Sequence, residues 1–415
     1  MSANPAPGQF WNIRPQAVIG CRTPEEVAEA LAHARHSGLQ LAVRSGGHCF
    51  AGRSTTDGIV IDTGPMDAVE VADGTVRVGA GARLGAIYDA LSAHGLAIAA
   101  GCGPTVGIAG LALGGGLGIL GRRHGLASDQ VLSAQAVLAD GRVVECDADT
   151  EPDLFWALRG AGGCQFAIVT AFTLRTVPAP NVTTVHLQWR VEDAEAVLAA
   201  WQEWAPDAPD EVAVSLLVTA GPDPAEPPVA HAFGVGVEPP FPPPASADLR
   251  EFGLRAAKRH LAEHGPGEEA APGAHVYAKS EFFRRSLDAQ TIAELLAHLA
   301  EDRVAGEART LDFSPWGGAY NGVPETATAF AHRAERFLLK PDVVVGAAGA
   351  GHARDWLRRC WAITHACGSG RAYPNFPDPE LEDWRFAYHG ANVERLAQVK
   401  RAYDPDNVFR FDQSL

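Results

Sequence analysis

The stretch that decides the fold is residues 95–121, GLAIAAGCGPTVGIAGLALGGGLGILG, which contains no charged side chain in 27 positions. A run of this length is long enough to cross a bilayer as a helix. However, ten of its residues are glycine, and Pro104 lies among them. Because each glycine inside a helix costs roughly 1 kcal/mol relative to alanine, a membrane-spanning helix is excluded. The composition instead predicts a loop whose backbone closely approaches another group.

The end of this stretch, residues 116–121, also satisfies the GxGxxG pattern of dinucleotide-binding folds. In those folds the pattern follows a strand and opens an apolar helix, and an acidic residue stands about 20 positions later. Asp140 lies at a suitable distance, but the sequence RRHG at 122–125 would begin a helix poorly. A nicotinamide-binding fold is therefore an alternative on this evidence.

A second glycine-containing segment follows a short apolar strand near the N-terminus. It consists of Arg44, Ser45, Gly46, Gly47 and His48. Two glycines after a strand allow consecutive backbone N–H groups to converge on an anion, and the arginine and serine add donors. The other interpretation is an ordinary turn with a surface histidine, and the spacing alone favours neither.

The first third of the chain alternates helices and strands. Thr23, Pro24 and Glu26 form a capping box that begins a helix, and this helix ends at Gly38. Dipeptides of the Asp-Gly type at 73–74 and 140–141 predict hairpin turns. The other expected strands and helices cover residues 41–43, 59–61, 69–71, 76–78, 84–94 (helix), 131–144, 154–158 (helix) and 166–177. This pattern predicts an α+β domain over residues 1–178.

Pro178-Ala179-Pro180 marks a domain boundary. Beyond it we expect strands at 182–191, 212–219 and 230–237, and helices at 194–204, about 246–263 and about 289–302. Strands mixed with helices in this way predict an antiparallel sheet covered by helices in a second domain over residues 179–370. The short polar tail, residues 371–415, is expected to return and complete the first domain.

Composition limits the classes of partner. The 34 lysines and arginines against 50 aspartates and glutamates give a net charge of −16 at pH 7. Nucleic acid and anionic membranes are therefore not expected as partners, because both need basic clusters. The seven cysteines form no CxxC pair, so we expect neither a metal site nor a disulfide framework. With no signal peptide expected in residues 1–12, we expect a cytoplasmic protein that is a monomer or a small homo-oligomer.

Six segments resemble the covalent FAD-linked oxidases of the vanillyl-alcohol-oxidase superfamily, in particular its berberine-bridge-enzyme-like branch. They are RSGGHCFAG (44–52), GPTVGIAGLALGGGLG (103–118), DLFWALRGAGGCQFAIVT (153–170), PWGGAY (315–320), AYPNFPD (372–378) and YDPDNVFRF (403–411). The resemblance runs along residues 15–178 and returns at 315–333 and 371–415. It implies a PCMH-type FAD-binding domain, built from two α/β subdomains, and a separate substrate domain.

The resemblance also implies site residues. His48 is expected to bond the 8α-methyl carbon of FAD through a ring nitrogen, in a loop 44–48 that binds the pyrophosphate. The second cofactor segment is expected to act through Gly103, Thr105, Val106, Gly107, Gly110, Gly114, Gly116 and Gly118. The adenine side is assigned to Ile168 and Val169, the isoalloxazine face to Tyr373 and Asn375, and a contact of the tail with the flavin region to Asn407.

The chain departs from the family pattern at three places. Relatives with two flavin bonds carry a cysteine where Gly103 stands, and a shift of one residue to Cys102 turns the thiol to the other side of an extended loop. We therefore expect one covalent bond, through His48, with a second through Cys102 as the alternative. Phe376 replaces the second tyrosine of a paired-tyrosine site, so Tyr373 would act alone. Cys164 and Gln165 replace the usual Gly-Asn, which we expect to alter contacts with FAD without abolishing binding.

The activity implied is that of an FAD-dependent oxidase. A carbinol or amine carbon of a small organic substrate, such as a sugar or a secondary metabolite, would give hydride to flavin N5 while Tyr373 removes the heteroatom proton. The ordinary pKa of tyrosine is about 10, so a neighbouring donor or positive potential must activate it. Val106 resembles the residue that leaves room for dioxygen, which would reoxidise the flavin and form H2O2. A dehydrogenase with another electron acceptor, and a flavin-binding protein without turnover, are the alternatives.

Overall fold

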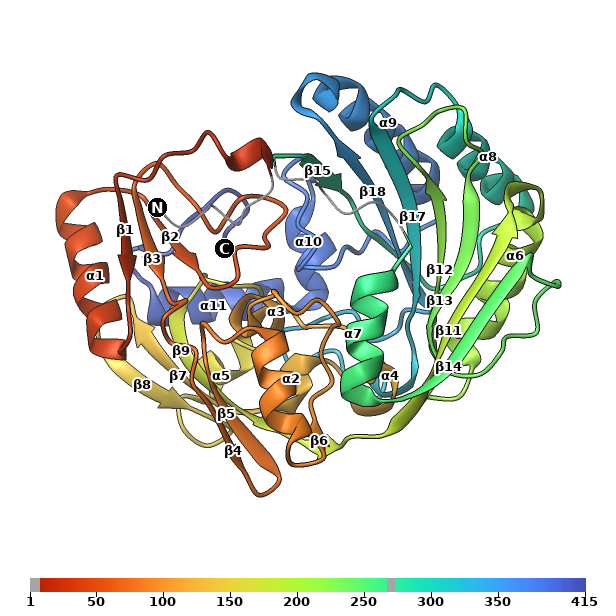
Figure 1. Cartoon of the computed structure of the whole chain (residues 1–415). Helices are drawn as coiled ribbons and strands as arrows, with labels where there is room; N and C mark the ends of the chain where they lie inside the picture. The colour runs from red at the N-terminus through yellow and green to blue at the C-terminus, as the bar shows by residue number, and fades with distance from the viewer. Residues whose placement is uncertain (1–7, 267–272) are drawn as a thin grey trace.

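The computed structural model describes residues 8–266 and 273–415. Figure 1 shows two bodies joined side by side. Following the division predicted from the sequence, we refer to residues 8–178 and 371–415 as the first domain, and to residues 179–266 and 273–370 as the second domain.

The N-terminal part of the first domain is a small parallel sheet with strand order β1–β3–β2. Its strands are β1 (Ala17–Gly20), β2 (Leu41–Arg44) and β3 (Ile59–Asp62). Helix α1 (Pro24–Ser37) follows the predicted capping box, since Thr23 Oγ1 accepts a hydrogen bond from the Glu26 backbone at 3.2 Å. Gly38 ends this helix in the left-handed region, at φ 68°.

The second part of the first domain is a five-stranded antiparallel sheet with strand order β4–β5–β9–β7–β8. Its strands are β4 (Val69–Ala72), β5 (Thr75–Gly79), β7 (Val131–Leu138), β8 (Val143–Cys146) and β9 (Ala167–Arg175). Three helices contribute to its core, namely α2 (Leu84–Ser92), α3 (Ile108–Leu113), which lies within the glycine-rich stretch, and α5 (Pro152–Ala157). A short pair, β6 (Leu96–Ala97) and β10 (Val177–Pro178), joins this sheet to the second domain.

The elements around residues 116–121 exclude the nicotinamide-binding alternative. The residues directly before Gly116 form α3 and a loop rather than a strand, and residues from Gly121 form only the one-turn helix α4 (Gly121–His124). A dinucleotide fingerprint requires a strand before the glycines and a long helix after them.

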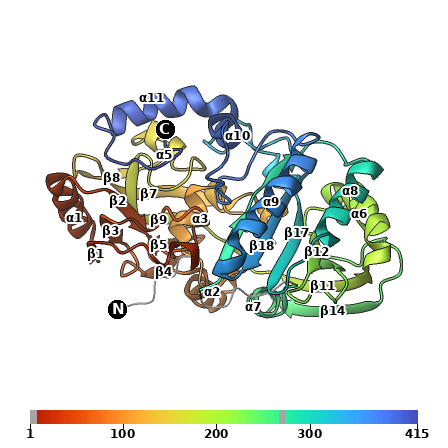
Figure 2. The same cartoon turned by 90° about the horizontal axis from the view of Figure 1, so that it is seen from above.

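The second domain is built on an eight-stranded antiparallel sheet with strand order β14–β11–β13–β12–β17–β18–β15, in which β16 also pairs with β18. Its strands are β11 (Asn181–Arg190), β12 (Ala213–Ala220), β13 (Val229–Val235), β14 (Ser246–Gly253), β15 (His275–Ala278), β16 (Glu281–Phe283), β17 (Glu307–Pro315) and β18 (Phe337–Val345). Its outer face is covered by α6 (Ala194–Trp204), α8 (Ala289–Ala300) and α9 (Ala350–His365) (Figures 1 and 2). The predicted antiparallel sheet covered by helices is confirmed.

One predicted element of this domain is wrong. The helix expected at about 246–263 is divided into β14 and α7 (Leu254–His264). Residues 246–253 pair along their full length with β11 and form the edge of the sheet. These backbone hydrogen bonds outweigh the weak helix preference of an alanine- and arginine-containing segment. Helix α7 then lies on the inner face of the sheet, toward α2 of the first domain (Figure 1).

The tail returns to the first domain as α10 (Trp384–His389) and α11 (Val393–Tyr403), and α11 lies along α5 (Figure 2). Lys400, buried on α11, donates to the Gln165 carbonyl at 2.8 Å and to the Phe409 carbonyl at 2.6 Å. It also pairs with Asp404 at 2.7 Å. One ammonium group therefore joins α11 and the last residues of the described chain to the loop before β9.

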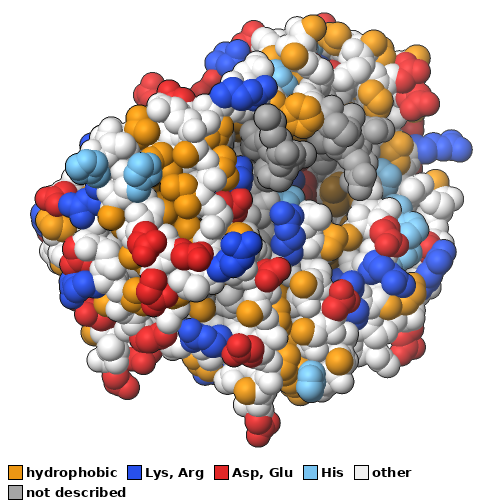
Figure 3. All heavy atoms as spheres, turned by 60° about the vertical axis from the view of Figure 1, so that its left-hand side comes forward, with side chains coloured by type: hydrophobic (Ala, Val, Ile, Leu, Met, Phe, Trp, Pro, Cys, Tyr) orange, Lys and Arg blue, Asp and Glu red, His pale blue; other side chains and the backbone are white. Residues whose placement is uncertain are grey.

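The surface agrees with the charge of the chain. On the face seen in Figure 3, basic side chains are interspersed with acidic ones and form no stripe. Within residues 8–266 and 273–415, no helix is both long and apolar enough to cross a membrane. The same residues contain no cluster of histidine, cysteine and carboxylate groups that would hold a metal ion.

Candidate active site

The loop after β2 packs directly against the second glycine-rich segment. A Cβ atom on Gly46 would lie 2.3 Å from the Gly107 backbone nitrogen, so only glycine allows these backbones to approach this closely. Ser45 Oγ donates to the Ala80 carbonyl at 2.7 Å, which fixes the start of the loop. Gly47 has φ 80°, a left-handed conformation that turns the chain toward His48. The structure thus brings together the two segments predicted to bind FAD.

His48 lies at the exposed end of this loop, beside Thr105 and Arg83. Partial desolvation, and then the positive charge of Arg83, lower the pKa of His48, while a hydrogen bond to the Thr105 backbone opposes this. Arg83 itself is fixed by a 2.9 Å hydrogen bond to the Thr105 carbonyl. The net effect favours the neutral imidazole, which has the nitrogen lone pair needed to bond a carbon atom.

Arg44 was expected to add a donor to the pyrophosphate loop, and this role stays a prediction. Its buried guanidinium pairs with Asp62 at 2.9 Å across the adjacent strands β2 and β3. Because this charge is already neutralised, anion recognition in the loop falls mainly to the backbone N–H groups of the two glycines.

Two tyrosines hold the loop that follows α3. Tyr373 Oη, from the returning tail, accepts hydrogen bonds from the Gly116 N–H at 2.8 Å and the Leu117 N–H at 3.1 Å. Tyr320 Oη, from the second domain, exchanges 3.1 Å hydrogen bonds with both the N–H and the carbonyl of Gly118. Three motifs that lie far apart in the sequence, at 103–118, 315–320 and 372–378, therefore meet at one loop.

Asn375 completes this arrangement. Its Nδ2 donates to the Leu111 carbonyl at 2.9 Å and to Tyr373 Oη at 3.2 Å. A Cβ atom on Gly114 would lie 2.1 Å from Asn375 Oδ1, which explains a glycine at this position. Tyr373 Oη thus receives three N–H donors, of the kind expected to stabilise a phenolate.

Burial acts against this stabilisation. Tyr373 is 2% exposed and lies among aromatic side chains, with its ring centroid 5.0 Å from that of Phe376. Burial raises the pKa of Tyr373, and the Asn375, Leu117 and Gly116 donors oppose the increase without cancelling it. The role of Tyr373 as a base stays a prediction, because its oxygen would have to exchange one of these donors for the substrate.

A charged cluster on the inner face of the second-domain sheet was not found from the sequence. Lys340 on β18 pairs with Asp342 at 3.2 Å and with Asp312 on β17 at 3.5 Å. Burial would lower the pKa of Lys340, but the two carboxylates outweigh this effect and raise it. Its ammonium also lies 5.3 Å from the centre of the Phe376 ring, so the cluster faces the Tyr373 region. The sequence signal that could have revealed this cluster is a charged residue at alternate positions of an otherwise apolar strand.

The remaining predicted residues occupy several environments. Ile168 and Val169 are buried on β9, in two different core clusters. Asn407 lies in a left-handed turn after α11, at φ 50°, where the neighbouring Asp406 pairs with Arg35 of α1. The predicted contact of Asn407 with the flavin region stays a prediction. Cys164 adopts φ 55°, a left-handed conformation that glycine adopts more readily than other residues.

The chain offers what an FAD molecule needs. Ser54 Oγ and Thr55 Oγ1, just after the 44–52 motif, are buried and have no hydrogen-bond partner among the described residues. Buried polar groups of this kind normally have a partner, and phosphate or ribityl oxygens would supply one. A Cβ on Gly110 would meet no protein atom within 4 Å, and one on Gly103 would meet only the Val106 side chain, at 3.0 Å. Open space beside these two glycines fits close approach of a ligand to the backbone.

Comparison with known families agrees with this geometry. A family model described as an FAD binding domain matches residues 15–147, and one described as berberine and berberine like matches residues 372–415. The chain is 30% identical over 427 residues to the uncharacterized FAD-linked oxidoreductase YgaK of Bacillus subtilis, covering 97% of this chain and 91% of the relative. It is 31% identical over 452 residues to a chitooligosaccharide oxidase of Gibberella zeae, covering 98% and 89%.

Solved structures share the whole fold. Berberine bridge enzyme from Eschscholzia californica superimposes with a TM-score of 0.87 at 24% identity, covering 100% of this chain and 93% of that one. A chitooligosaccharide oxidase superimposes with a TM-score of 0.85 at 24% identity, covering 99% and 94%. At this identity the structures establish the fold, while the relatives above establish the family and the enzyme class. The chain belongs to the berberine bridge enzyme-like family of FAD-linked oxidoreductases.

Proposed function

We propose that the protein is an FAD-dependent oxidase that removes hydride from a carbinol or amine carbon of a small organic substrate, with FAD attached covalently to His48 and dioxygen as the electron acceptor. The observation that carries the proposal is the meeting of the loop bearing His48, the loop held by Tyr373 and Tyr320, and the charged inner face of the second-domain sheet.

Bound FAD would supply a two-electron acceptor for the substrate carbon. The backbone of 44–48 and the glycines of the second segment would hold its phosphates and ribityl chain, while the pairing of Tyr373 and Tyr320 with Gly116 and Gly118 would keep the adjoining loop rigid. The protein's contribution is thus orientation and local charge.

The substrate would lie between the 114–118 loop and the inner face of the sheet. Asp312, Lys340 and Asp342 supply one ammonium and two carboxylates there, which suits hydroxyl or amine groups of a polar substrate. Hydride loss from a carbinol or amine leaves a heteroatom proton to be removed. Tyr373 is the group proposed to take it, and Asp312 and Asp342 of the cluster are the alternatives.

The covalent bond is tested by denaturation. We expect acid-precipitated protein to keep its yellow colour and a fluorescent band in SDS gels, and His48→Ala to release FAD under the same conditions while remaining folded. Cys102→Ala is the matched control and should retain flavin. Release of flavin from the unmodified protein would refute covalent attachment. Retention by His48→Ala, with release only from the double variant, would show that Cys102 forms a second bond.

The reaction is tested by an anaerobic screen of sugars, alcohols and amines, read from bleaching of the flavin absorbance. Rapid recovery of the absorbance on adding air, faster than turnover, is the expected result for an oxidase. Slow recovery in air together with fast recovery with an artificial acceptor would instead establish a dehydrogenase. Absence of bleaching by every compound would favour a flavin-binding protein without turnover.

A further inference from the structure

Lys258 is a buried cation that the proposed reaction leaves without a role. It belongs to α7 of the second domain, yet its side chain reaches into the first domain and is only 1% exposed. Its Nζ donates to the Ala100 carbonyl at 2.5 Å and to the Gly101 carbonyl at 3.3 Å. Both carbonyls belong to the 95–121 stretch, which supplies no charge of its own.

The groups around the ammonium are neutral or positive. It lies 3.9 Å from the centre of the Tyr88 ring, on α2, and Tyr88 Oη also donates to the Gly101 carbonyl. The thiol of Cys102 and the guanidinium of Arg255 are the other titratable groups that act on it. Among the described residues, no carboxylate lies within ion-pair distance of Lys258 Nζ. A buried cation held only by carbonyls and a ring is costly, and such groups are concentrated at functional sites.

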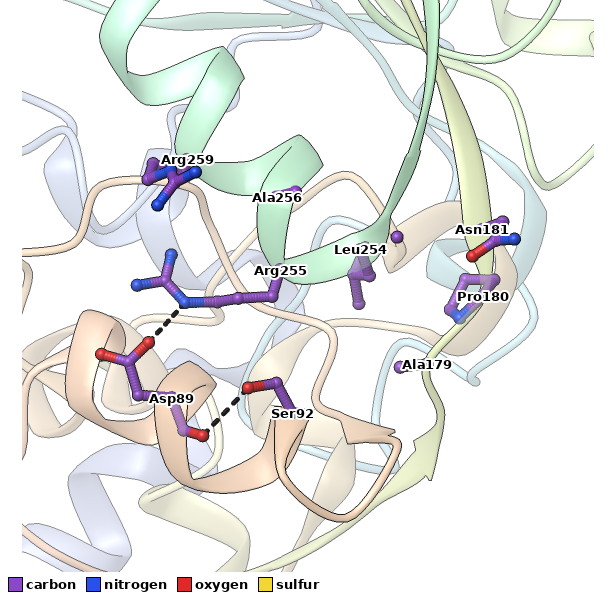
Figure 4. Close-up of a pocket in the computed structure, with 10 residues that line it drawn as sticks. Asp89, Ser92, Ala179, Pro180, Asn181, Leu254, Arg255, Ala256 and Arg259 are labelled. Atoms are coloured by element: carbon purple, nitrogen blue, oxygen red, sulfur yellow. Dashed lines mark hydrogen bonds and ion pairs between the residues drawn. The ribbon is translucent and has the colours of Figure 1, made fainter.

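Other residues also join α7 to the first domain. On the outside of α7, Arg255 pairs with Asp89 of α2 at 2.7 Å and lines a cavity of about 430 Å3 between the two helices (Figure 4). Leu254 packs in the same region against Ala97 and Ala99. These contacts join α7 to the first domain beside Lys258, whereas Lys258 itself bonds the backbone of the 95–121 stretch.

The position of the carbonyls connects Lys258 to the cofactor loop. Gly101 precedes Cys102 and Gly103, and the segment continues to Thr105, whose backbone contacts His48. The Gly118 backbone approaches the same place, because a Cβ there would lie 2.3 Å from the Ala100 carbonyl oxygen. Ala100 therefore adjoins both the beginning and the end of the glycine-rich segment, and the ammonium is bonded at that junction.

We propose that Lys258 is a positioning residue for the redox reaction. Its ammonium brings a positive charge from the second domain into the FAD-binding loop and fixes the carbonyls of Ala100 and Gly101. This charge favours the acceptance of electrons by the cofactor. A charge of this kind acts strongly because the region is desolvated, and local charge is one of the means by which proteins tune flavins. The inference rests on FAD binding and is independent of the identity of the substrate.

The charge should be present only over part of the pH range. Burial lowers the pKa of Lys258 to about 8, with Cys102 opposing and Arg255 adding to this effect. Tyr88 and Cys102 face the ammonium from the first domain, and burial raises the pKa of both, so they stay neutral where lysine titrates. The effect of Lys258 should therefore be full at pH 7 and lost above about pH 9.

The experiment is a potentiometric titration of the holoprotein with redox dyes between pH 6.5 and 9.5. Lys258→Met has nearly the same length without the charge, and Lys258→Arg keeps the charge. Arg259→Met removes an exposed cation from the same helix and is the matched control. We expect Lys258→Met to lower the midpoint potential at pH 7 and to converge with the unmodified protein above pH 9. Lys258→Arg should lose the pH-dependent step, and Arg259→Met should match the unmodified protein at each pH.

An unchanged potential in Lys258→Met, with only a lower melting temperature, would overturn the proposal and leave Lys258 as a structural contact. If Lys258→Met does not fold, the unmodified holoprotein still decides, because the proposal requires its potential to show a step near pH 8 beyond the slope of the flavin itself. Absence of that step would also overturn it. The titration needs no substrate, so failure of the proposed oxidase activity leaves this test intact.

Discussion

Tyr373 and Tyr320 hold the same loop in different ways. Tyr320 both donates to and accepts from Gly118, so its hydroxyl proton is engaged in a hydrogen bond. Tyr373 Oη accepts from Gly116, Leu117 and Asn375. Only a tyrosine with its proton directed elsewhere, toward a ligand, is suited to exchange protons with that ligand.

This difference predicts unequal effects of removing the two hydroxyls. Tyr373→Phe should retain FAD but slow anaerobic flavin reduction by about 100-fold or more, since general base catalysis typically contributes that much. Tyr320→Phe is the control, because it removes comparable loop hydrogen bonds, and its reduction rate should change only a few-fold. The measurement is stopped-flow absorbance with a reducing substrate.

The pH dependence of the flavin reduction rate also tests whether Tyr373 is the base. Because burial raises the pKa of Tyr373, the reduction rate in the unmodified protein should rise with pH through the alkaline range. Equal losses in the two tyrosine variants would assign both residues to loop geometry. Asp312→Asn and Asp342→Asn would then identify the base.

Among individual residues, the sequence identified those whose contacts depend on neighbours along the chain. His48, Gly46 and Asn375 stand in motifs, and their contacts follow from those motifs. Lys340 and Asp312 stand on different strands, and nothing in a local pattern indicates that β17 and β18 pair. The ion pair of Arg44 with Asp62 was missed for the same reason.

Among the elements, β16 and α9 are joined by an unusual carboxylate. Glu281 on β16 is 2% exposed, its Oε2 lies 2.7 Å from His365 Nδ1, and its Oε1 accepts from the Gly370 N–H at 2.7 Å. Burial raises the pKa of Glu281 to about 7, although these partners oppose the increase. The folded protein therefore binds a proton here that the unfolded chain releases at about pH 4.3.

This linkage predicts how stability changes with pH. Between about pH 4 and 7 the native state holds more protons at Glu281 than the unfolded state, so this group's contribution falls as pH rises. Glu281→Gln removes the titration, and we expect it to match the unmodified protein near pH 4.5 and to exceed its unfolding free energy by roughly 3 kcal/mol at pH 8. Urea unfolding at several pH values measures this. Glu294→Gln, on the exposed face of α8, is the control. A difference independent of pH would contradict the assignment.

The boundaries of helices and strands could be predicted where capping or turn residues mark them in the sequence. Thr23 and Gly38 bound α1, and Asp73-Gly74 connects β4 to β5, as expected. Residues 246–253 form a strand because β11 offers an unpaired edge, which is a property of the partner rather than of the segment. Tertiary pairing of this kind is absent from any local pattern.

In the molecule as a whole, each domain places one buried cationic side chain in the other domain. Lys258 of the second domain bonds carbonyls of the first, and Arg122 of the first domain bonds carbonyls of the second. Arg122 is 2% exposed and donates to the carbonyls of Ala205, Pro206, Ala208 and Val212 at 2.7 or 2.8 Å. Each domain thus completes the hydrogen bonds of the other.

Removing Arg122 should weaken the whole assembly. Arg122→Met leaves four carbonyls without these donors, and we expect a loss of about 4 kcal/mol, because each unsatisfied buried group costs about 1–3 kcal/mol and the losses overlap. The exposed neighbour Arg123 supplies the matched control, Arg123→Met, which should change stability by less than about 0.5 kcal/mol. Guanidinium unfolding followed by fluorescence is the measurement. Equal midpoints for the two variants would show that Arg122 does not stabilise the docked domains.

The return of residues 371–415 to the first domain has a consequence for biosynthesis. The loop at Gly116 needs Tyr373, and the loop before β9 needs Lys400, yet both residues follow the entire second domain in the chain. At a translation rate of about 10 residues per second, the first part of the FAD-binding domain waits about 20 s on the ribosome for the segment that completes it. Nascent chains halted before residue 371 should therefore carry no tightly held flavin, and cofactor loading is a late step that follows synthesis of the tail.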